Sequence, residues 1–352
     1  MNTSLNGKRV LLVGGAGFIG HNLALELKRR GAEVAILDGL EVNNLLSLHT
    51  ASNQLAEREL YLGVINERLE LLRAAKIPLH VEDARDHARM SLLFNQTEPQ
   101  VVVLLAAVAH ASRSNKDPYH TFDHSFRTLE NALDNSRGRV EHFLYFSSSM
   151  VYGNFEGAAV TEESRCDPIG IYGALKFGGE KLVIAYNQVF SLPYTIVRPS
   201  ALYGERCISR RVGQVFIENA CRGRDLLIRG DGSDSLDFTY IGDLVNGLCC
   251  CIEHPEAKNQ IFNLTYGQGR SLNEMAEIIK SEFPGIGIQY AARDALMPER
   301  GTLDVAKAKR LIGYEPRFPL EIGYRRYIQW YRGLFKRVDA APHVSAGSQL
   351  NE

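Results

Sequence analysis

Residues 8–38 read KRVLLVGGAGFIGHNLALELKRRGAEVAILD, and this stretch decides the fold. The apolar run 8–13 predicts a buried strand, the segment 18–30 predicts a helix that Gly31 ends, and 33–37 predicts a second buried strand. Strands that are apolar on both faces suit a parallel sheet covered by helices on both sides. The stretch therefore predicts a βαβ unit.

The turn between the first strand and the helix, GGAGFIG, contains Gly14, Gly17 and Gly20. Glycines let the chain turn sharply and let its backbone approach a pyrophosphate, which the free N–H groups of the helix N-terminus attract. A glycine triplet alone is weak evidence, but strand, loop, helix and second strand all fall where a dinucleotide needs them. We expect the backbone here, with Phe18 and Ile19, to bind the cofactor.

The second strand ends at Asp38, about 20 residues beyond the glycines. A carboxylate at this position accepts hydrogen bonds from the adenosine ribose hydroxyls and would repel a 2′-phosphate. No arginine follows immediately. Asp38 therefore favours NAD over NADP as the cofactor.

The rest of the first 200 residues continues to alternate strands with helices. Further strands are predicted at 79–82, 100–106, 140–147 and 194–198, with helical segments at 43–76, 90–95, 122–135 and 172–190. This alternation predicts an α/β fold with a Rossmann-type, doubly wound parallel sheet.

The pattern loosens after about residue 200. We predict an NAD-binding Rossmann domain at 1–200, a smaller C-terminal α/β substrate-binding domain at 201–338, interleaved with the first, and a disordered tail at 339–352. Helices in the second part are expected at 211–222, 243–253, 272–283, 304–312 and 320–335.

Composition is that of an ordinary globular chain, with 45% hydrophobic and 23% charged residues and a formal net charge of −1. Without a basic block, a nucleic-acid partner is not expected. The longest apolar run, near 101–108, is too short to cross a bilayer, so no membrane partner is expected. The N-terminus lacks a signal segment, which favours the cytoplasm.

Cysteine spacing indicates reduced thiols, because no CxxC pair occurs and three cysteines are consecutive. Cys207 is the one that falls in a loop near the predicted site. The six are Cys166, Cys207, Cys221, Cys249, Cys250 and Cys251.

Two segments suggest a catalytic site. Tyr172 and Lys176 are four residues apart on a predicted helix, so they share one face. Ser148 and Ser149 stand at the carboxyl end of a buried strand, where open parallel sheets bind ligands. An ammonium and a positive nicotinamide ring would both favour the phenolate of Tyr172, which could then take a hydroxyl proton while hydride leaves. Ser148 would hold the same substrate oxygen, and Ser149 is a weaker candidate for substrate binding.

These residues resemble the extended short-chain dehydrogenase/reductase family, in its NAD-dependent nucleotide-sugar epimerase and dehydratase branch. The resemblance covers 8 to about 335 and rests on the order and spacing of many motifs. They are GGAGFIG, Asp38, VEDARD around Asp83, LLAA at 104–107, FSSSMVYG, YGALK, RPSALYG at 198–204, GDGSDSLDFTYIGD at 230–243, and PERG with Trp330.

The resemblance implies a role for each matching residue. Asp83 would lie against the adenine, Ala106 and Ala107 would line the cofactor, and Lys176 would also hold the nicotinamide ribose. The C-terminal third would bind a nucleoside diphosphate sugar. The implied reaction is 4-epimerisation, in which NAD stays bound and a transient 4-keto sugar rotates and takes hydride back on its other face.

Three departures from the family pattern bear on the substrate. Members that dehydrate or decarboxylate carry an acid just after the catalytic serine or threonine, where this chain has Ser149 and Met150. Ala201 and Leu236 replace an asparagine and an arginine that usually hold the diphosphate, and Ser125 replaces a helix asparagine. Either arginines hold the diphosphate, with Arg300 and Arg211 preferred, or the substrate is not the usual one. The other candidates are Arg206 and Arg210.

The leading interpretation is thus a nucleotide-sugar 4-epimerase. The main alternative is a nucleotide-sugar oxidoreductase that releases NADH. A 4,6-dehydratase or decarboxylase fits less well, and a non-catalytic NAD sensor would not need Ser148, Tyr172 and Lys176 together. The resemblance also implies a homodimer formed through the helices at 122–135 and 172–190. The nucleotide base and the sugar are left open.

Overall fold

The computed structural model describes residues 4–41, 44–45, 48, 57–107, 111–293 and 297–340. Helix α13 (Leu320–Ala340) runs two residues into the segment predicted as a tail, and 341–352 lie outside the described residues, as does much of 43–57. No helix among the described residues is long and apolar enough to cross a membrane.

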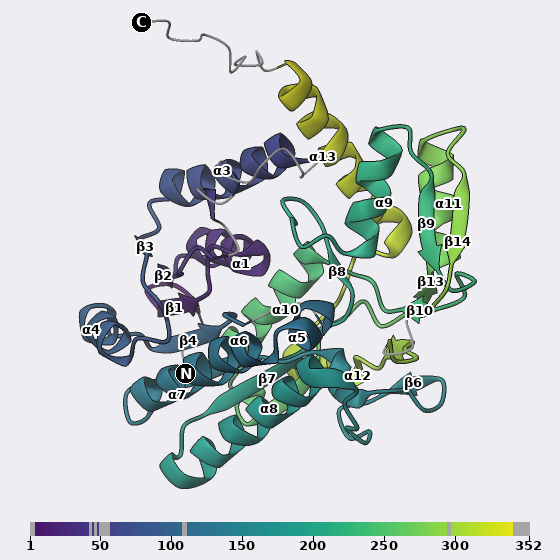
Figure 1. The fold of residues 1–352 in the computed structure, drawn as a ribbon. Coiled ribbons are helices and arrows are strands. Elements are labelled where there is room, and N and C mark those ends of the chain that lie inside the picture. Colours follow the sequence, from purple (N-terminus) through teal and green to yellow (C-terminus); the bar gives the residue numbers. More distant parts are fainter. Residues whose placement is uncertain are drawn as a thin grey trace, which may run out of the picture.

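A seven-stranded sheet forms the centre of the molecule (Figure 1). All of its pairings are parallel, in the order β12-β7-β5-β4-β1-β2-β3. Since the chain first builds outward from β1 to β3 and then crosses back to β4, the strand order reverses next to β1. Ligands of open α/β sheets bind at this kind of switch point. The strands are β1 (Arg9–Val13), β2 (Glu33–Leu37), β3 (Leu79–His80), β4 (Val101–Leu104), β5 (His142–Phe146), β7 (Tyr194–Arg198) and β12 (Gln260–Asn263).

The sheet is buried on both faces, as its apolar strands predict. Successive side chains of a strand point to opposite faces, so Leu11 and Leu12 of β1, both fully buried, enter different hydrophobic clusters. One face is covered by α1 (Phe18–Arg29), α3 (Arg58–Ala74) and α10 (Ile241–Glu253), and the other by α4 (His87–Thr97), α7 (Thr128–Ser136) and α8 (Gly170–Phe190). The Rossmann-type fold is confirmed.

A smaller layer lies beyond the carboxyl ends of the strands. It contains α9 (Val212–Cys221), α11 (Leu272–Glu282), part of α13, and the pair β9 (Leu226–Arg229) and β14 (Ile288–Ala291). The chain leaves this layer to add α10 and β12 to the main body, so residues after 200 contribute to both parts (Figure 1).

Short elements complete the described chain. The two-residue strands form the pairs β6 (Ala159–Val160) with β15 (Thr302–Leu303), β8 (Leu202–Tyr203) with β11 (Thr239–Tyr240), and β10 (Ser235–Leu236) with β13 (Arg270–Ser271). The helices are α5 (Ala111–Lys116), α12 (Ala306–Ile312), and the 3₁₀ turns η2 (Ser149–Tyr152) and η3 (Pro255–Ala257).

Two element boundaries differ from the sequence prediction. The helix expected at 122–135 begins earlier, as α6 (Pro118–Phe122), because Asp117 caps it and proline suits its first turn. It then passes through a π-helical turn, η1 (Asp123–Arg127), before α7. The strand expected at 79–82 ends at His80, and this short strand forms one edge of the sheet.

Candidate active site

The glycine turn after β1 has the geometry that its sequence predicts. Gly14 has a φ of +84°, and a Cβ there would lie 2.5 Å from the backbone nitrogen of Ala106. A Cβ on Gly20 would lie 2.5 Å from the Cα of Gly15, so this glycine lets α1 pack closely against the turn. At Gly17 a Cβ would meet only the Gly14 oxygen, 3.5 Å away. The chain thus leaves an open, backbone-lined space beside the start of α1.

The N-terminus of α1 has the features of an anion-binding site. Gly17 is its N-cap, no side chain caps it, and its first turn, which includes Phe18 and Ile19, has no acidic residue. Unsatisfied N–H groups and the positive end of the helix dipole therefore face the space beside Gly17. These features fit the pyrophosphate of a dinucleotide.

Asp38 ties the two predicted cofactor segments together. Its Oδ2 accepts a hydrogen bond from Ala16 N at 2.9 Å, and its Oδ1 accepts one from Leu40 N at 2.8 Å. Burial raises the pKa of this carboxyl, while the two N–H bonds oppose the rise. Each carboxylate oxygen keeps a second lone pair, so Asp38 can still accept ribose hydroxyls.

The remaining predicted cofactor residues lie beyond the carboxyl ends of β4 and β3, on either side of β1 and β2. Ala106 N donates to Val13 O at 2.9 Å, next to Gly14, and Ala107 follows it. Asp83 lies just beyond β3 and is exposed, and its carboxylate receives the Arg85 guanidinium at 2.7 Å. Arg85 holds the pKa of Asp83 below its usual value.

A cavity of about 340 Å³ brings together most of the other predicted residues. It is lined from the cofactor side by Ile19 and Ala107 and from the opposite side by Arg211 and Arg300. Its wall between these two ends contains the four predicted residues Ser148, Ser149, Tyr172 and Lys176. Residues from β1–α1, β5, α8 and the C-terminal layer therefore converge on one space.

Tyr172 and Ser148 are hydrogen-bonded to each other, with Tyr172 near the start of α8 and Ser148 at the end of β5. Burial raises the pKa of Tyr172, while the charge of Arg211 and the hydrogen bond from Ser148 lower it. Without further positive charge the phenol is therefore protonated at neutral pH. A cation bound against it would favour the phenolate.

Lys176 lies one helical turn further along α8. Its Nζ donates to Phe146 O at 2.7 Å and is 6.0 Å from the centre of the Tyr172 ring. Burial lowers the pKa of Lys176 to about 8, against the charge of Glu180. The ammonium is thus held at the end of β5, near the Tyr172 ring.

A buried ion pair beneath these residues did not figure in the sequence prediction. Arg198, the last residue of β7, donates to both oxygens of Glu180 on α8, at 2.9 and 2.7 Å. Ser147 at the end of β5 donates to the same carboxylate at 2.5 Å. Glu180 is four residues after Lys176, on the same helix face, and this spacing is the sequence signal that could have drawn attention to Glu180. The network fixes α8 against two strand ends.

The substrate side of the cavity is positively charged and contains unpaired polar groups. Arg210, Arg211, Arg300 and Lys176 line it, and no acidic residue of the described chain does. Among the described residues, Arg300 Nε has no hydrogen-bond partner. The hydroxyls of three other lining residues, Ser200, Tyr203 and Tyr327, have none either. Burial, followed by the charge of Arg211, lowers the pKa of Arg300 to about 10. The space suits an anionic, hydroxyl-rich ligand.

The structure also shows where the residues that depart from the family pattern lie. Ala201 and Leu236 line the cavity, and Ala201 has a φ of +36°, in the region that asparagine tolerates better than alanine. Ser149 and Met150 begin the η2 turn, and Ser125 is in η1.

Cys207 and Arg206, which the sequence places near the predicted site, lie differently with respect to the cavity. Cys207 lines the cavity and contacts Ser209 Oγ at 3.0 Å, and all six cysteines are free. Arg206 points away, with its Nε donating to His21 Nε2 at 2.9 Å and its Nη1 paired with Glu67. Of the four arginines considered for the diphosphate, Arg206 is therefore the one that does not reach the cavity.

Fold and site together define an enzyme that binds a dinucleotide at the carboxyl edge of a parallel sheet. Residues 10–265 match the model of the NAD dependent epimerase/dehydratase family. The chain belongs to this family, in the extended short-chain dehydrogenase/reductase branch, and it is an NAD-dependent enzyme.

Individual relatives cover nearly the whole chain. A putative UDP-glucose 4-epimerase of Methanocaldococcus jannaschii is 29% identical over 92% of this chain and 98% of its own length. A UDP-N-acetyl-alpha-D-glucosaminuronate decarboxylase of Bacillus cytotoxicus is 28% identical over 92% and 98%. The UDP-glucose 4-epimerase of Thermus thermophilus, solved in complex with NAD, superimposes with a TM-score of 0.79 at 25% identity, covering 92% of this chain and 99% of that one.

Proposed function

We propose that the protein is a nucleotide-sugar 4-epimerase in which Tyr172 is the base. The observation that carries this proposal is the meeting of Tyr172, Ser148 and Lys176 in one cavity, between the glycine turn and a group of arginines. When bound, NAD supplies the carbon that accepts hydride and later returns it. The glycine turn and Asp38 would hold its pyrophosphate and ribose, and Asp83, Ala106 and Ala107 would lie along it.

Tyr172 takes the proton of the sugar 4-hydroxyl as hydride leaves the same carbon, so a 4-keto sugar forms. Ser148, already hydrogen-bonded to the phenol, holds the reacting oxygen. With NAD bound, Lys176 would hold its nicotinamide ribose and add positive charge beside the phenol. After the keto sugar has rotated, Tyr172 would give the proton back as the same carbon regains its hydrogen on the other face. The cycle is redox-neutral and releases no NADH.

Arg211 and Arg300 are the groups best placed for the diphosphate. The charge of Arg211 disfavours the charged form of Arg300, and an anion bound between them would relieve this repulsion. Arg300 also offers an unpaired Nε. Ser149 lines the same cavity and would be a further polar contact for the sugar.

The two residues after the catalytic serine favour the epimerase over the family's other reactions. Ser149 and Met150 provide no carboxylate to move the C5 proton of a dehydration or to act on a sugar carboxylate. This weighs against a decarboxylase, even though one relative bears that name. The alternative of a net oxidoreductase requires release of NADH.

The reaction assay is chosen to separate these possibilities. We expect the purified enzyme, incubated with UDP-glucose, UDP-glucuronate, UDP-N-acetylglucosamine and dTDP-glucose in turn, to convert at least one into its C4 epimer, as detected by NMR. NADH absorbance should not accumulate. Steady NADH formation would support the oxidoreductase, and loss of water or CO₂ would overturn the epimerase.

Native mass spectrometry of the same preparation reports retained NAD and the number of subunits.

We propose a homodimer formed through α6–α7 and α8. These helices pack against each other and leave Tyr119, Phe122, Val189 and Phe190 exposed. Exposed apolar side chains on adjacent helices are typical of a subunit interface.

The arginine assignment predicts a change in substrate affinity. Arg300→Met should raise KM by roughly 10- to 100-fold with a smaller effect on kcat, because a charged hydrogen bond to the diphosphate is lost. Arg293→Met is the control, since Arg293 lies nearby but pairs with Asp234 at 3.1 Å outside the cavity. An unchanged KM in Arg300→Met would remove this residue from the substrate site.

A further inference from the structure

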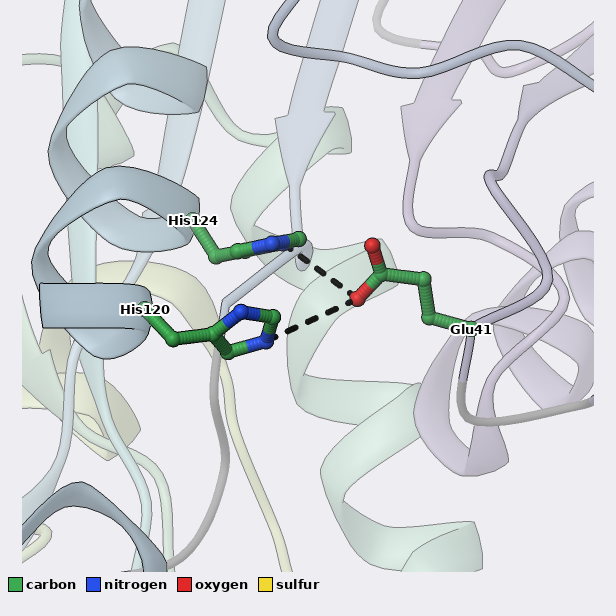
Figure 2. Close-up of side chains that lie close together, drawn as sticks. All are labelled: Glu41, His120 and His124. Atoms are coloured by element: carbon green, nitrogen blue, oxygen red, sulfur yellow. Dashed lines mark ion pairs between the residues drawn. The ribbon is translucent and has the colours of Figure 1, made fainter. Parts of the chain in front are cut away.

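A cluster of three potential metal ligands lies outside the active-site cavity. Glu41 follows β2, while His120 is on α6 and His124 on η1 (Figure 2). Their ligand atoms all lie within 4.8 Å of one another, and no other such group of three occurs among the described residues. Figure 2 shows both imidazole rings turned toward the same carboxylate oxygen.

The spacing of the ligand atoms is close to that of a metal centre. Glu41 Oε2 lies 3.3 Å from His124 Nδ1 and 4.0 Å from His120 Nε2. Two ligands on a tetrahedral zinc ion, at bond lengths near 2.0–2.1 Å, are separated by about 3.4 Å. The Glu41–His124 pair therefore already has the required separation, the Glu41–His120 pair needs a shift of roughly half an ångström, and the two histidine nitrogens lie within 4.8 Å of each other.

The backbone around the three side chains is held in place. Asp117 accepts a hydrogen bond from His120 N at 3.1 Å and so caps the turn that carries this histidine. His120 and His124 are four residues apart, and their ring centres are 3.8 Å from each other. On the other side, Asp38 holds Leu40 N, the residue before Glu41. Separate contacts thus hold the backbone at His120 and next to Glu41.

The charges near the cluster are compatible with a cation. Arg85 approaches Glu41 only to 3.8 Å, whereas it binds Asp83 and Asp123 at 2.7 and 2.8 Å. The Arg85 guanidinium is therefore satisfied without Glu41. Arg127 pairs with Asp123 at 3.0 Å, which leaves three carboxylates against two guanidinium groups around the histidines.

We propose that Glu41, His120 and His124 form a binding site for a divalent transition-metal ion such as Zn²⁺. Two imidazoles and one carboxylate are the ligand types that this class of ion prefers, and water would complete the coordination. The half-exposed Glu41 carboxylate leaves an entry path for the ion. A bound ion would tie the segment after β2 to α6 and η1, beside Asp38.

The proposal is tested by direct binding to the untagged enzyme with its NAD. We expect Zn²⁺ in calorimetry to bind with one equivalent per chain, and Co²⁺ to give the visible absorption bands of a tetrahedral site. His120→Ala and His124→Ala should each weaken binding by at least about tenfold. Glu41→Gln keeps the shape of the side chain and should weaken it as well, which guards against an effect of misfolding.

The control is His87→Ala. His87 pairs with Asp134 at 3.2 Å and, within the described part of the chain, has no third ligand beside it, so its removal should leave the stoichiometry and affinity unchanged. The absence of saturable binding by the wild-type enzyme would overturn the proposal. Binding that survives in His120→Ala and His124→Ala but falls in His87→Ala would overturn it too.

Discussion

Tyr172→Phe should lower turnover by about 10²- to 10⁴-fold, the range expected when a positioned acid–base group is removed. The substitution takes away only the hydroxyl that is hydrogen-bonded to Ser148, and the ring keeps its place in the cavity. The hydrogen bonds of Asp38 and the close contacts of the glycine turn are made with other groups. Retained NAD, counted by native mass spectrometry, should therefore be unchanged.

Tyr145→Phe is the matched control for this substitution. The Tyr145 ring lies 5.3 Å from Lys176 Nζ, slightly closer than the Tyr172 ring, but it does not line the cavity. If proximity to the ammonium alone made a tyrosine essential, both variants would lose activity. We expect Tyr145→Phe to retain most of its turnover. Wild-type rates in Tyr172→Phe would eliminate the proposed base.

Local sequence patterns explain why much of the candidate cofactor site can be predicted from the sequence. The turn around Gly14 and Gly17 is set by backbone sterics within one short loop, and the position of Asp38 follows from the end of the next strand. Helix periodicity alone predicts that Tyr172 and Lys176 lie on the same face of α8. The meeting of α8 with Ser148 follows once the sheet is known to be parallel, because strand ends share one edge.

Other features depend on contacts between distant segments and carry little sequence signal. Arg198 ends an otherwise apolar strand and Glu180 lies on a helix, and only their burial against each other shows that they form a pair. The π-helical turn η1 adds a residue to a helix whose periodicity looks regular. His120 and His124 are visibly four apart, but Glu41 reaches them only because β2 ends beside that helix.

The second large effect is expected on stability, from the substitution Arg198→Met. The side chains of Arg198 and Glu180 are only 3% and 1% exposed, and the guanidinium also donates to Tyr152 Oη at 3.0 Å. Removing the cation leaves a buried carboxylate with only Ser147 as a partner. Breaking one side of such a pair costs about 3–5 kcal/mol, so the free energy of unfolding in urea should fall by this amount.

The Arg29–Glu26 pair provides a comparison with nearly the same geometry in a different environment. Arg29 also binds both oxygens of a glutamate, each at 2.7 Å, but its side chain is 71% exposed. Water and salt screen that pair, so Arg29→Met should lower the free energy of unfolding far less than Arg198→Met does. Replacing both buried partners, as Arg198→Met with Glu180→Leu, should recover part of the loss because no unpaired charge remains. Equal losses in Arg198→Met and Arg29→Met would mean that burial of the Arg198–Glu180 pair does not control the stability of α8 against the sheet.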